Sequence, residues 1–417
     1  MDTMPSPATA SVIALLVAIV ISCTSRINVG LLAIPLAWAV GVYGGRPADA
    51  VLGGFPSALF VTLAGVTALF SLSESNGSIA LVAHRMLGVA RGRHYLVPVI
   101  VFAIACLVSS IGPGAIVSVA IVAPVAMAIG RRAGISPFLM ALMVANGANA
   151  GNLSPLSAVG IIANTRMAAA GLGGHEWKVF AANFLAHVMV GAGAYALLLH
   201  HDRRYDAADI PIERTRFTMA QWITLAVVTT WVVGVVFFAL PIGLSAFAAA
   251  AAVIILRAAD EGTAIKRMPW SAIVMVCGMT MLVTLVEKSG GMDVFTAMLA
   301  KLARPSTING MIAFVTGVIS TYSSTSAVVL PTFLPTVPGL VQQVGGGNPL
   351  AVALSINVGA SIVDVSPLST LGALCVATIA EPEASRDLFR KLLIWGLSMS
   401  VVGALMCQVL AGVFARL

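Results

Sequence analysis

The sequence has little charge, and this scarcity sets the class of protein. Only 9% of its 417 residues are charged, whereas 59% are hydrophobic and the mean hydropathy is +1.00. Soluble domains carry about 25% charged residues. A soluble chain of this length could not hide so much apolar surface. We therefore expect an all-α polytopic membrane protein with little chain left over for a soluble domain.

Other features are missing as well. The cysteines stand singly in apolar sequence, without metal-ligand spacing: Cys23, Cys106, Cys277, Cys375 and Cys407. The histidines do not cluster, and the spans contain no paired acids. These absences argue against an intramembrane enzyme. No basic residue precedes the first apolar stretch, so we expect no cleavable signal. The net charge of +7 falls in loops at the membrane edge, so it does not indicate nucleic-acid binding.

What the sequence does have is a duplication. Gly147–Ser157 (GANAGNLSPLS) returns 212 residues later as Gly359–Ser369 (GASIVDVSPLS). Two further pairs keep nearly this spacing, Glu74–Gly77 with Glu287–Gly290 and Ser109–Pro124 with Ser320–Pro335. We interpret residues 1–200 and 219–417 as two repeats joined by a linker, 201–218. A duplicated break in an apolar segment points to a transporter's binding site.

Each repeat has five stretches long enough to span a membrane. The predicted spans are 9–24, 28–44, 56–73, 138–169 and 178–200, then 219–238, 241–257, 269–287, 349–380 and 390–415. The fourth span of each half, 138–169 or 349–380, is broken at Ser-Pro-Leu-Ser. Regions 96–130 and 308–340 have polar centres, which favours re-entrant hairpins over the alternative of two full spans each. Two amphipathic segments, Ser78–Arg93 and Met292–Arg304, are expected to lie in the interface.

The number of spans sets the topology. Five spans are an odd number, so the second repeat must be inverted relative to the first. Of the 23 Lys and Arg residues, this arrangement places 16 on one side and 7 on the other. Cytoplasmic loops carry the excess. We therefore expect both termini outside, a cytoplasmic linker 201–218, the first hairpin entering from the cytoplasm and the second from outside.

These motifs resemble a known family. Residues 27–172 are similar to the N-terminal region of MatC-type malonate and dicarboxylate carriers. The similarity is carried by Gly54-Phe55-Pro56-Ser57, Gly112-Pro113-Gly114-Ala115, Val122-Ala123-Pro124-Val125 and Ser154-Pro155-Leu156-Ser157. The second half resembles the wider ion-transporter superfamily, which includes divalent anion:sodium symporters. Its hairpin tips carry Ser-Asn-Thr. Here Ser323-Ser324-Thr325 has serine for asparagine, and the first tip retains neither the Asn nor the Thr.

The resemblance implies a secondary carrier in a bacterial inner membrane. Such a carrier imports a small dicarboxylate such as malonate or succinate, coupled to Na⁺ or H⁺, by elevator-type alternating access. It also implies a homodimer and no bound cofactor. Two alternatives within transport stay open: a carrier of another ion, such as arsenite or Na⁺ exchanged for H⁺, and the membrane subunit of a binding-protein-dependent (TRAP-type) carrier.

A dianion at mid-membrane needs compensation, yet the hairpins and breaks contain no basic side chain. Helix N-termini supply unpaired N–H groups instead. The predicted substrate-binding residues are Gly112, Pro113, Gly114, Ser157, Ser323, Ser324, Thr325 and Ser369. The competing interpretation of each hydroxyl is a bond to its own helix. Arg166, the nearest cation, is expected to snorkel to the outer interface, with substrate contact as the alternative.

The predicted cation site centres on Asp364. It is the one acidic residue inside the broken spans, and its repeat partner is Asn152. A carboxylate here would repel a dianion unless it bound Na⁺ or a proton. The full predicted set is Ser110, Asn149, Asn152, Ser361 and Asp364. The alternative for Asp364 is a helix N-cap, and Glu74 and Glu287 are expected to be interfacial or capping residues.

Overall fold

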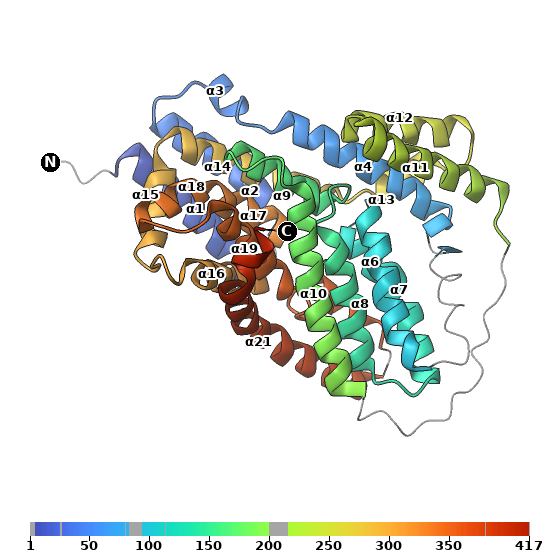
Figure 1. Ribbon diagram of the computed structural model, residues 1–417. Coiled ribbons are helices and arrows are strands. Elements are labelled where there is room, and N and C mark those ends of the chain that lie inside the picture. The colour runs from blue at the N-terminus through green and yellow to red at the C-terminus, as the bar shows by residue number, and fades with distance from the viewer. Residues whose placement is uncertain are drawn as a thin grey trace.

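The computed structural model is helical throughout the part of the chain that it describes (Figure 1). That part comprises residues 5–25, 27–79, 81–82, 94–112, 114–199, 216–379 and 381–416. The predicted interfacial segment Ser78–Arg93 and the linker 201–218 lie largely outside these ranges.

The helices of the two halves follow one another in the same order. The first half contains α1 (Pro7–Thr24), α2 (Val29–Tyr43), α3 (Ala48–Leu52), α4 (Ser57–Ser75), α6 (Val97–Ile111), α7 (Gly114–Arg132), α8 (Pro137–Asn152), α9 (Ala158–Ala169) and α10 (Glu176–Leu199). The second half contains α11 (Met219–Phe238), α12 (Ile242–Ile255), α13 (Glu261–Arg267), α14 (Trp270–Lys288), α15 (Gly291–Ala300), α16 (Ile308–Tyr322), α17 (Leu330–Phe333), α18 (Val337–Val344), α19 (Pro349–Ile362), α20 (Thr370–Ala377) and α21 (Pro382–Phe414).

The same local signals start corresponding helices. Ser136 caps α8 by accepting from the N–H of Leu139, and Pro137 occupies the first turn. Asn348 caps α19 in the same way, followed by Pro349, 212 residues after Pro137. Proline suits the first helical turn because its missing N–H has no partner there. The duplicated sequence therefore begins two equivalent helices.

Both copies of the Ser-Pro-Leu-Ser motif lie between helices. The first copy separates α8 from α9, and the second separates α19 from α20. Helix α8 and helix α19 are almost entirely buried along their length. Each break therefore leaves backbone N–H and C=O groups without helical partners deep inside the molecule.

Two helix hairpins accompany the breaks. In the first, α6 turns into α7 at Gly112, and the Ser118 hydroxyl of α7 donates back to Ala105 O of α6 at 2.7 Å. In the second, α16 leads through extended Ser323 into a π-helical turn, η3 (Thr325–Val329). Prolines at 331, 335 and 338 then divide the returning arm into α17, the 3₁₀ turn η4 (Leu334–Thr336) and α18, since proline lacks the N–H that a continuous helix needs.

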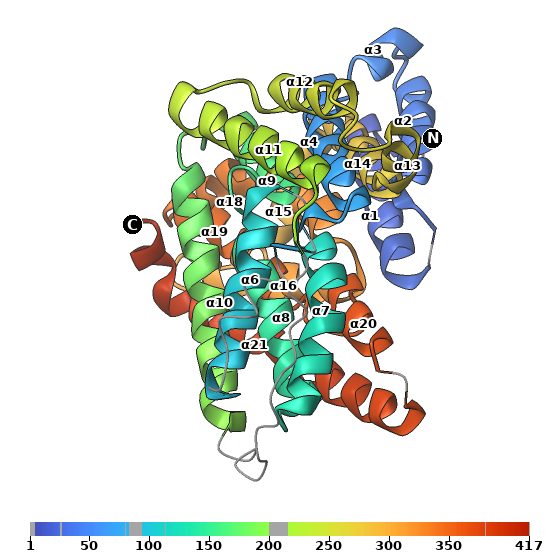
Figure 2. The ribbon, with the colours of Figure 1, turned by 90° about the vertical axis from the view of Figure 1, so that its right-hand side faces the viewer.

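The helices form two groups. One contains α1–α4 and α11–α15, and the other contains the hairpins, the broken helices, α10 and α21. In both views α4, α11 and α12 lie at the top of the molecule, and α6, α7, α8 and α10 run side by side below them (Figures 1 and 2). Helices α1, α4, α14 and α15 contact the second group.

The first group is held by two equivalent helix crossings. Helix α2 packs on α14 where Gly30 meets Gly278, and α12 packs on α4 where Gly243 meets Gly65. A Cβ built at Gly278 would lie 2.2 Å from Gly30 O, and one built at Gly65 would lie 2.4 Å from Gly243 O. Because glycine has no Cβ, the backbones touch directly, as small residues allow between membrane helices.

By length and composition, five helices among the described residues can each cross a membrane: α4, α7, α10, the arm Thr325–Val344, and α21. A sixth span results if α14 and α15, bent by 92°, are taken together. Helices α1, α2, α6, α11, α12, α16 and α19 are apolar but shorter. The sequence predicted ten spans. Two of them, 138–169 and 349–380, are broken into short helices that single-helix length does not register, and four others coincide with the shorter helices α1, α2, α11 and α12. Helix α7 and the arm Thr325–Val344, which are long enough to span, belong to the two predicted hairpins. Helix α15 overlaps the second predicted interfacial segment, Met292–Arg304.

Candidate functional site

A cavity of about 380 Å³ lies where the hairpin tips meet the helix breaks. Hairpin α6–α7 contributes Gly114 and Ala115, and the second hairpin contributes the stretch 322–326. The α8–α9 break contributes Asn152, and the α19–α20 break contributes Asp364 and Ser369. Four chain interruptions therefore converge on one space, which is lined by hydroxyl, amide and carboxylate groups.

Asp364 is held by the second hairpin tip. The Thr325 hydroxyl donates to Asp364 Oδ2 at 2.8 Å, and it also lies 2.5 Å from Ser320 Oγ. A hydroxyl has only one hydrogen. Because Thr325 gives its hydrogen to the carboxylate, Ser320 donates to Thr325. One carboxylate oxygen is thus fixed, in a side chain that lines the cavity.

Asn152, the repeat partner of Asp364, makes the corresponding contact in the first half. Its Oδ1 accepts from the N–H of Ala115 at 3.0 Å, so it caps the start of α7 at the tip of the first hairpin. Each broken helix therefore ends in a polar side chain that reaches the hairpin tip of its own repeat. One of the two is a neutral amide and the other a carboxylate.

The duplicated serines Ser157 and Ser369 differ in whether they cap the helix that follows. Ser157 donates to Asn152 O and accepts from the N–H of Gly160 at 3.0 Å, so it caps α9. Ser369 donates to Asp364 O at 2.5 Å but makes no capping bond to α20. The α20 N-terminus therefore carries no side-chain cap, and its first residues, Thr370 and Leu371, line the cavity. Uncapped N–H groups at a helix start attract anions.

The structure brings most of the predicted substrate-binding residues to the cavity: Gly114, Ser323, Ser324, Thr325 and Ser369 line it. Ser157 does not, because its hydroxyl serves the break itself. Gly112 instead packs against Phe70, where a Cβ would lie 2.0 Å from the ring, at φ +152°. Pro113 lies outside the described residues.

The predicted cation residues divide more sharply. Asn152 and Asp364 line the cavity. Ser110 bonds to Cys106 O of its own helix at 2.8 Å, the alternative that applies to any helical hydroxyl. Asn149 and Ser361 belong to a buried polar network that includes His187. The structure thus places these three outside the cavity lining.

Sequence reasoning missed the opposite wall. Helices α4 and α14 close the cavity with Leu63, Thr67, Ile273 and Val276, and Ser25 follows from the end of α1. The only signal was again the duplication, because Leu63 stands 212 residues before Met275, another lining residue. Side chains on this wall are mostly apolar, so the polar groups lie on the side of the hairpins and breaks.

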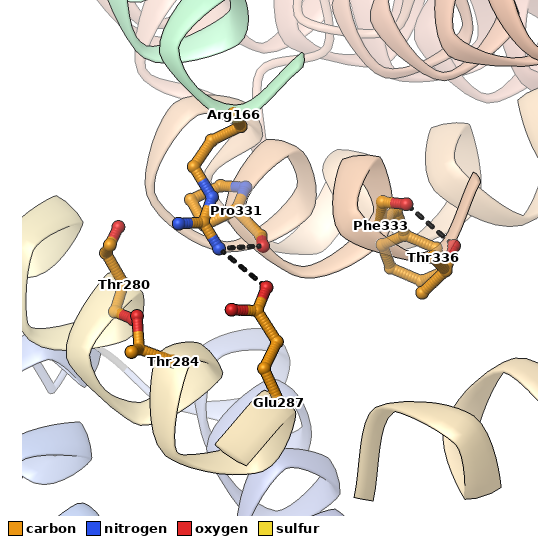
Figure 3. A network of polar contacts seen from close by, with 7 residues as sticks. All are labelled: Arg166, Thr280, Thr284, Glu287, Pro331, Phe333 and Thr336. Atoms are coloured by element: carbon orange, nitrogen blue, oxygen red, sulfur yellow. Dashed lines mark hydrogen bonds and ion pairs between the residues drawn. The ribbon is translucent and has the colours of Figure 1, made fainter. Parts of the chain in front are cut away.

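The expectation that Arg166 snorkels to an interface is wrong. Arg166 is only 6% exposed and does not line the cavity. Its Nη2 lies 3.6 Å from Glu287 Oε1 and donates to Pro331 O at 3.3 Å (Figure 3). The guanidinium stays buried because a carboxylate and a carbonyl compensate it, which also removes Glu287 from a purely interfacial role. The pair joins α9 to α14 and α17.

No basic side chain lines the cavity among the described residues. In the same ranges, no group of three or more His, Cys, Asp or Glu side chains is arranged to hold a metal ion. An anion in this space therefore has hydroxyls, amides and backbone N–H groups as partners. Any cation would have oxygen ligands around Asp364.

A multi-pass helical protein with helix breaks converging on a polar cavity has the architecture of a membrane transporter. Residues 5–152 match the family model of the dicarboxylate carrier protein MatC N-terminus. The match covers about a third of the chain and overlaps residues 27–172, where the sequence resembles MatC-type carriers. No curated protein sequence matches the chain.

Two solved structures share the fold over nearly the whole chain. The YdaH transporter of Alcanivorax borkumensis is 15% identical with a TM-score of 0.59, and the match covers 98% of this chain and 99% of that one. MtrF of Neisseria gonorrhoeae, described within a class of antimetabolite efflux pumps, is 14% identical with a TM-score of 0.60, covering 98% and 95%. At these identities the likeness concerns the fold.

Proposed function

We propose that this protein is a secondary active transporter that imports a small dicarboxylate, malonate-like or succinate-like, together with Na⁺ or H⁺. The observation that carries the proposal is the uncapped N-terminus of α20 beside Asp364, in a cavity built from both hairpin tips. It puts an anion-attracting helix end and a cation-attracting carboxylate in one space. The match of residues 5–152 to a dicarboxylate carrier family supports the substrate class.

In this proposal the dianion binds to the N-terminal end of α20 and to the hydroxyls of Ser323 and Ser324. No basic side chain is required, since helix N-termini carry partial positive charge. Uncompensated burial of a charge costs several kcal/mol or more, so the coupling cation has a second task. Bound near Asp364, it cancels the carboxylate that would otherwise repel the substrate.

The residues around Asp364 suit a hard cation. Its carboxylate, the Thr325 hydroxyl and the Ala360 carbonyl, which lies 3.3 Å from that hydroxyl, all present oxygen. Oxygen is the ligand that hard cations take. A proton on Asp364 would neutralise the charge equally well, so either ion fits the proposed cycle.

The two helix groups suggest how the cavity alternates between the two sides of the membrane. We infer that α1–α4 and α11–α15 form a scaffold, and that the hairpins, broken helices, α10 and α21 form the moving body. The cavity lies between them, against α4 and α14. Inverted repeats with one hairpin entering from each face, termini outside, and a homodimer in a bacterial inner membrane complete the proposal.

Reconstitution tests the proposed function directly. Purified protein in liposomes would be given labelled malonate or succinate with an inward Na⁺ gradient, an inward H⁺ gradient, or neither. We expect uptake above protein-free liposomes that requires one of the two gradients, which identifies the ion. Absence of uptake under every gradient, from protein shown to be folded, would contradict the proposal and favour another ion or a missing partner subunit.

A further inference from the structure

A buried histidine joins the two broken helices, and one of its partners, Ser361, stands three residues before the proposed cation residue Asp364. His187 of α10 is fully buried. Its Nδ1 lies 3.1 Å from Asn146 Oδ1 of α8, and its Nε2 lies 3.3 Å from Ser361 Oγ of α19. An ionisable side chain inside a membrane bundle marks a functional site unless packing explains it. Here each ring nitrogen has its own polar partner.

His187 is the middle of a chain of hydrogen bonds that ends in a backbone carbonyl at each side. The links run in this order: Leu142 O, Asn146, His187, Ser361, Asn183 and Asn149 O, over distances of 2.9, 3.1, 3.3, 2.6 and 2.6 Å. The four side chains of the chain are all fully or almost fully buried, with exposures of 0 to 1%. Bulk water therefore does not complete these bonds.

Counting hydrogens shows that this chain is incomplete when the histidine is neutral. It has five contacts, and each contact needs one hydrogen. Along the chain an amide supplies one, a hydroxyl supplies one and a neutral imidazole supplies one. The four side chains then supply four. The carbonyls at both ends only accept. In one of the five contacts, therefore, two acceptor atoms face each other with no hydrogen between them.

The shortage does not depend on how the groups are oriented. Turning either amide, or exchanging the imidazole tautomer, moves the unmatched contact to another link but leaves the number of hydrogens unchanged. The Ser361 hydroxyl also lies 3.2 Å from Val358 O, which adds a further acceptor. An imidazolium has a hydrogen on both nitrogens and supplies the missing one.

Two helix ends give a positive charge at His187 partial compensation for its burial. Asn149 and Ser361 lie in the last turns of α8 and α19, where the helix dipoles present their negative ends. Neither α8 nor α19 contains an ionisable residue, and α10 carries Glu176 and Lys178 at its start and Tyr195 farther on. Lys178 is the one fixed cation on these three helices and stands nine residues before His187, while Arg166 of α9, which also packs on α10, is paired with Glu287.

We propose that His187 is a proton-binding site that connects the two broken helices. Its ligand is a proton, and loading it completes the hydrogen-bond chain across α8, α10 and α19. Loss of the proton leaves one contact unmade and loosens the connection between the two repeats. The site goes beyond the proposed dicarboxylate function, and it binds its proton whether or not a dicarboxylate is the substrate.

Nitrogen NMR of the membrane-embedded protein, labelled with ¹⁵N-histidine, tests the site. A charged ring gives two similar protonated nitrogens, whereas a neutral ring gives one protonated and one unprotonated nitrogen. Spectra would be taken from about pH 5 to about pH 8, the range over which a histidine of ordinary pKa near 6.5 changes charge. The His187→Gln variant assigns the signal. We expect a charged His187 at the acid end, and a ring that stays neutral throughout would overturn the proposal.

A second variant separates proton binding from simple packing. Ser361→Ala removes two contacts and one hydrogen, so three contacts remain for three hydrogens and a neutral histidine completes the chain. The midpoint of His187 charging should then fall by at least about one pH unit, a tenfold loss of proton affinity. Ser355→Ala is the matched control, because its hydroxyl bonds to Ala351 O on the same helix, outside the chain. Equal midpoints in both variants and the wild type would contradict the proposal.

Discussion

At the scale of single residues, Asp364 and Asn152 show how one position in two repeats acquires two chemistries. Both side chains end a broken helix and both contact the hairpin tip of their own half. Asn152 caps a helix start and brings no charge. Asp364 brings a negative charge into the same cavity, and a transporter of anions can tolerate that only if a cation accompanies the substrate.

Asp364→Asn tests this asymmetry. The variant keeps the size of the side chain and can still accept from Thr325, but it cannot bind Na⁺ or a proton as a carboxylate does. We expect gradient-driven uptake to fall at least about tenfold, which corresponds to about 1.4 kcal/mol or more of lost coupling. Uptake in liposomes with and without the driving gradient measures it.

The control for that experiment is Asp260→Asn. Asp260 lies outside the cavity and caps α13 by accepting from the N–H of Thr263 at 2.7 Å. Asparagine caps a helix nearly as well as aspartate, so this variant should transport normally. If Asp364→Asn also retained gradient-driven uptake at the wild-type level, Asp364 would not be the coupling residue.

At the scale of helices, the Arg166–Glu287 pair connects the two helix groups. Arg166 lies on α9 of the proposed moving body, and Glu287 lies on α14 of the proposed scaffold (Figure 3). Breaking a fully buried ion pair costs about 3–5 kcal/mol, but the Glu287 side chain is 40% exposed. Solvent screening reduces the cost, so Arg166→Ala should lower the free energy of unfolding by about 2 kcal/mol.

A double-mutant cycle measures the pair itself. Thermal unfolding of the purified Arg166→Ala, Glu287→Ala and doubly substituted proteins should show non-additive losses, because each single variant strands a partner. Arg166→Lys should recover only part of the stability, since a lysine does not reproduce the planar guanidinium. Additive losses would show that the two side chains do not interact.

The glycine crossings support a second prediction about helices. Gly278→Ala would force α14 away from α2, because the added Cβ would lie 2.2 Å from Gly30 O. Overpacking of this kind costs about 1–3 kcal/mol. Gly412→Ala on α21 is the control, because nothing lies within 4 Å of a Cβ built at this position. It should be neutral or stabilise by up to about 1 kcal/mol, as glycine lowers helix propensity. Thermal unfolding distinguishes the two, and equal melting temperatures would contradict the crossing.

Local signals explain what the sequence made predictable at this scale. The pairs Ser136–Pro137 and Asn348–Pro349 start helices, and the Ser-Pro-Leu-Ser segments interrupt apolar stretches. Helix starts and breaks therefore depend on residues that are adjacent in the sequence. The division of the returning arm after Thr325 follows from three prolines. In contrast, the ion pair of Arg166 joins residues 121 positions apart. Nothing near Arg166 in the sequence identifies Glu287, so the sequence alone favours a snorkelling arginine where the structure has a buried one.

The same reason limits prediction of the site. Asp364 stood out because a single acid in an apolar break is rare, and the structure places it in the cavity. Ser110, Asn149 and Ser361 are polar residues on helices that lead into a hairpin tip or a break, but their side chains bond outside the cavity. Sequence period alone does not say which face of a fully buried helix meets the cavity, because α8 and α19 are buried on every side.

At the scale of the whole molecule, the repeats make a prediction about sidedness. If the halves are inverted, residues 212 positions apart lie on opposite faces of the membrane. Arg131 near the end of α7 and Gln343 near the end of α18 are such a pair, and both are exposed. The excess of Lys and Arg on one side places Arg131 in the cytoplasm and therefore places Gln343 outside.

Single cysteines at these two positions report the orientation, in a background whose five native cysteines are replaced. A membrane-impermeant thiol reagent should label Gln343→Cys in intact cells, and should label Arg131→Cys only after the membrane is opened. Neither position contacts the cavity, so transport should persist and prove that the labelled protein is folded. Labelling of both cysteines from the same side would refute the inverted arrangement. Labelling of Arg131→Cys alone in intact cells would keep the inversion but reverse the orientation, since the two faces would then have exchanged places.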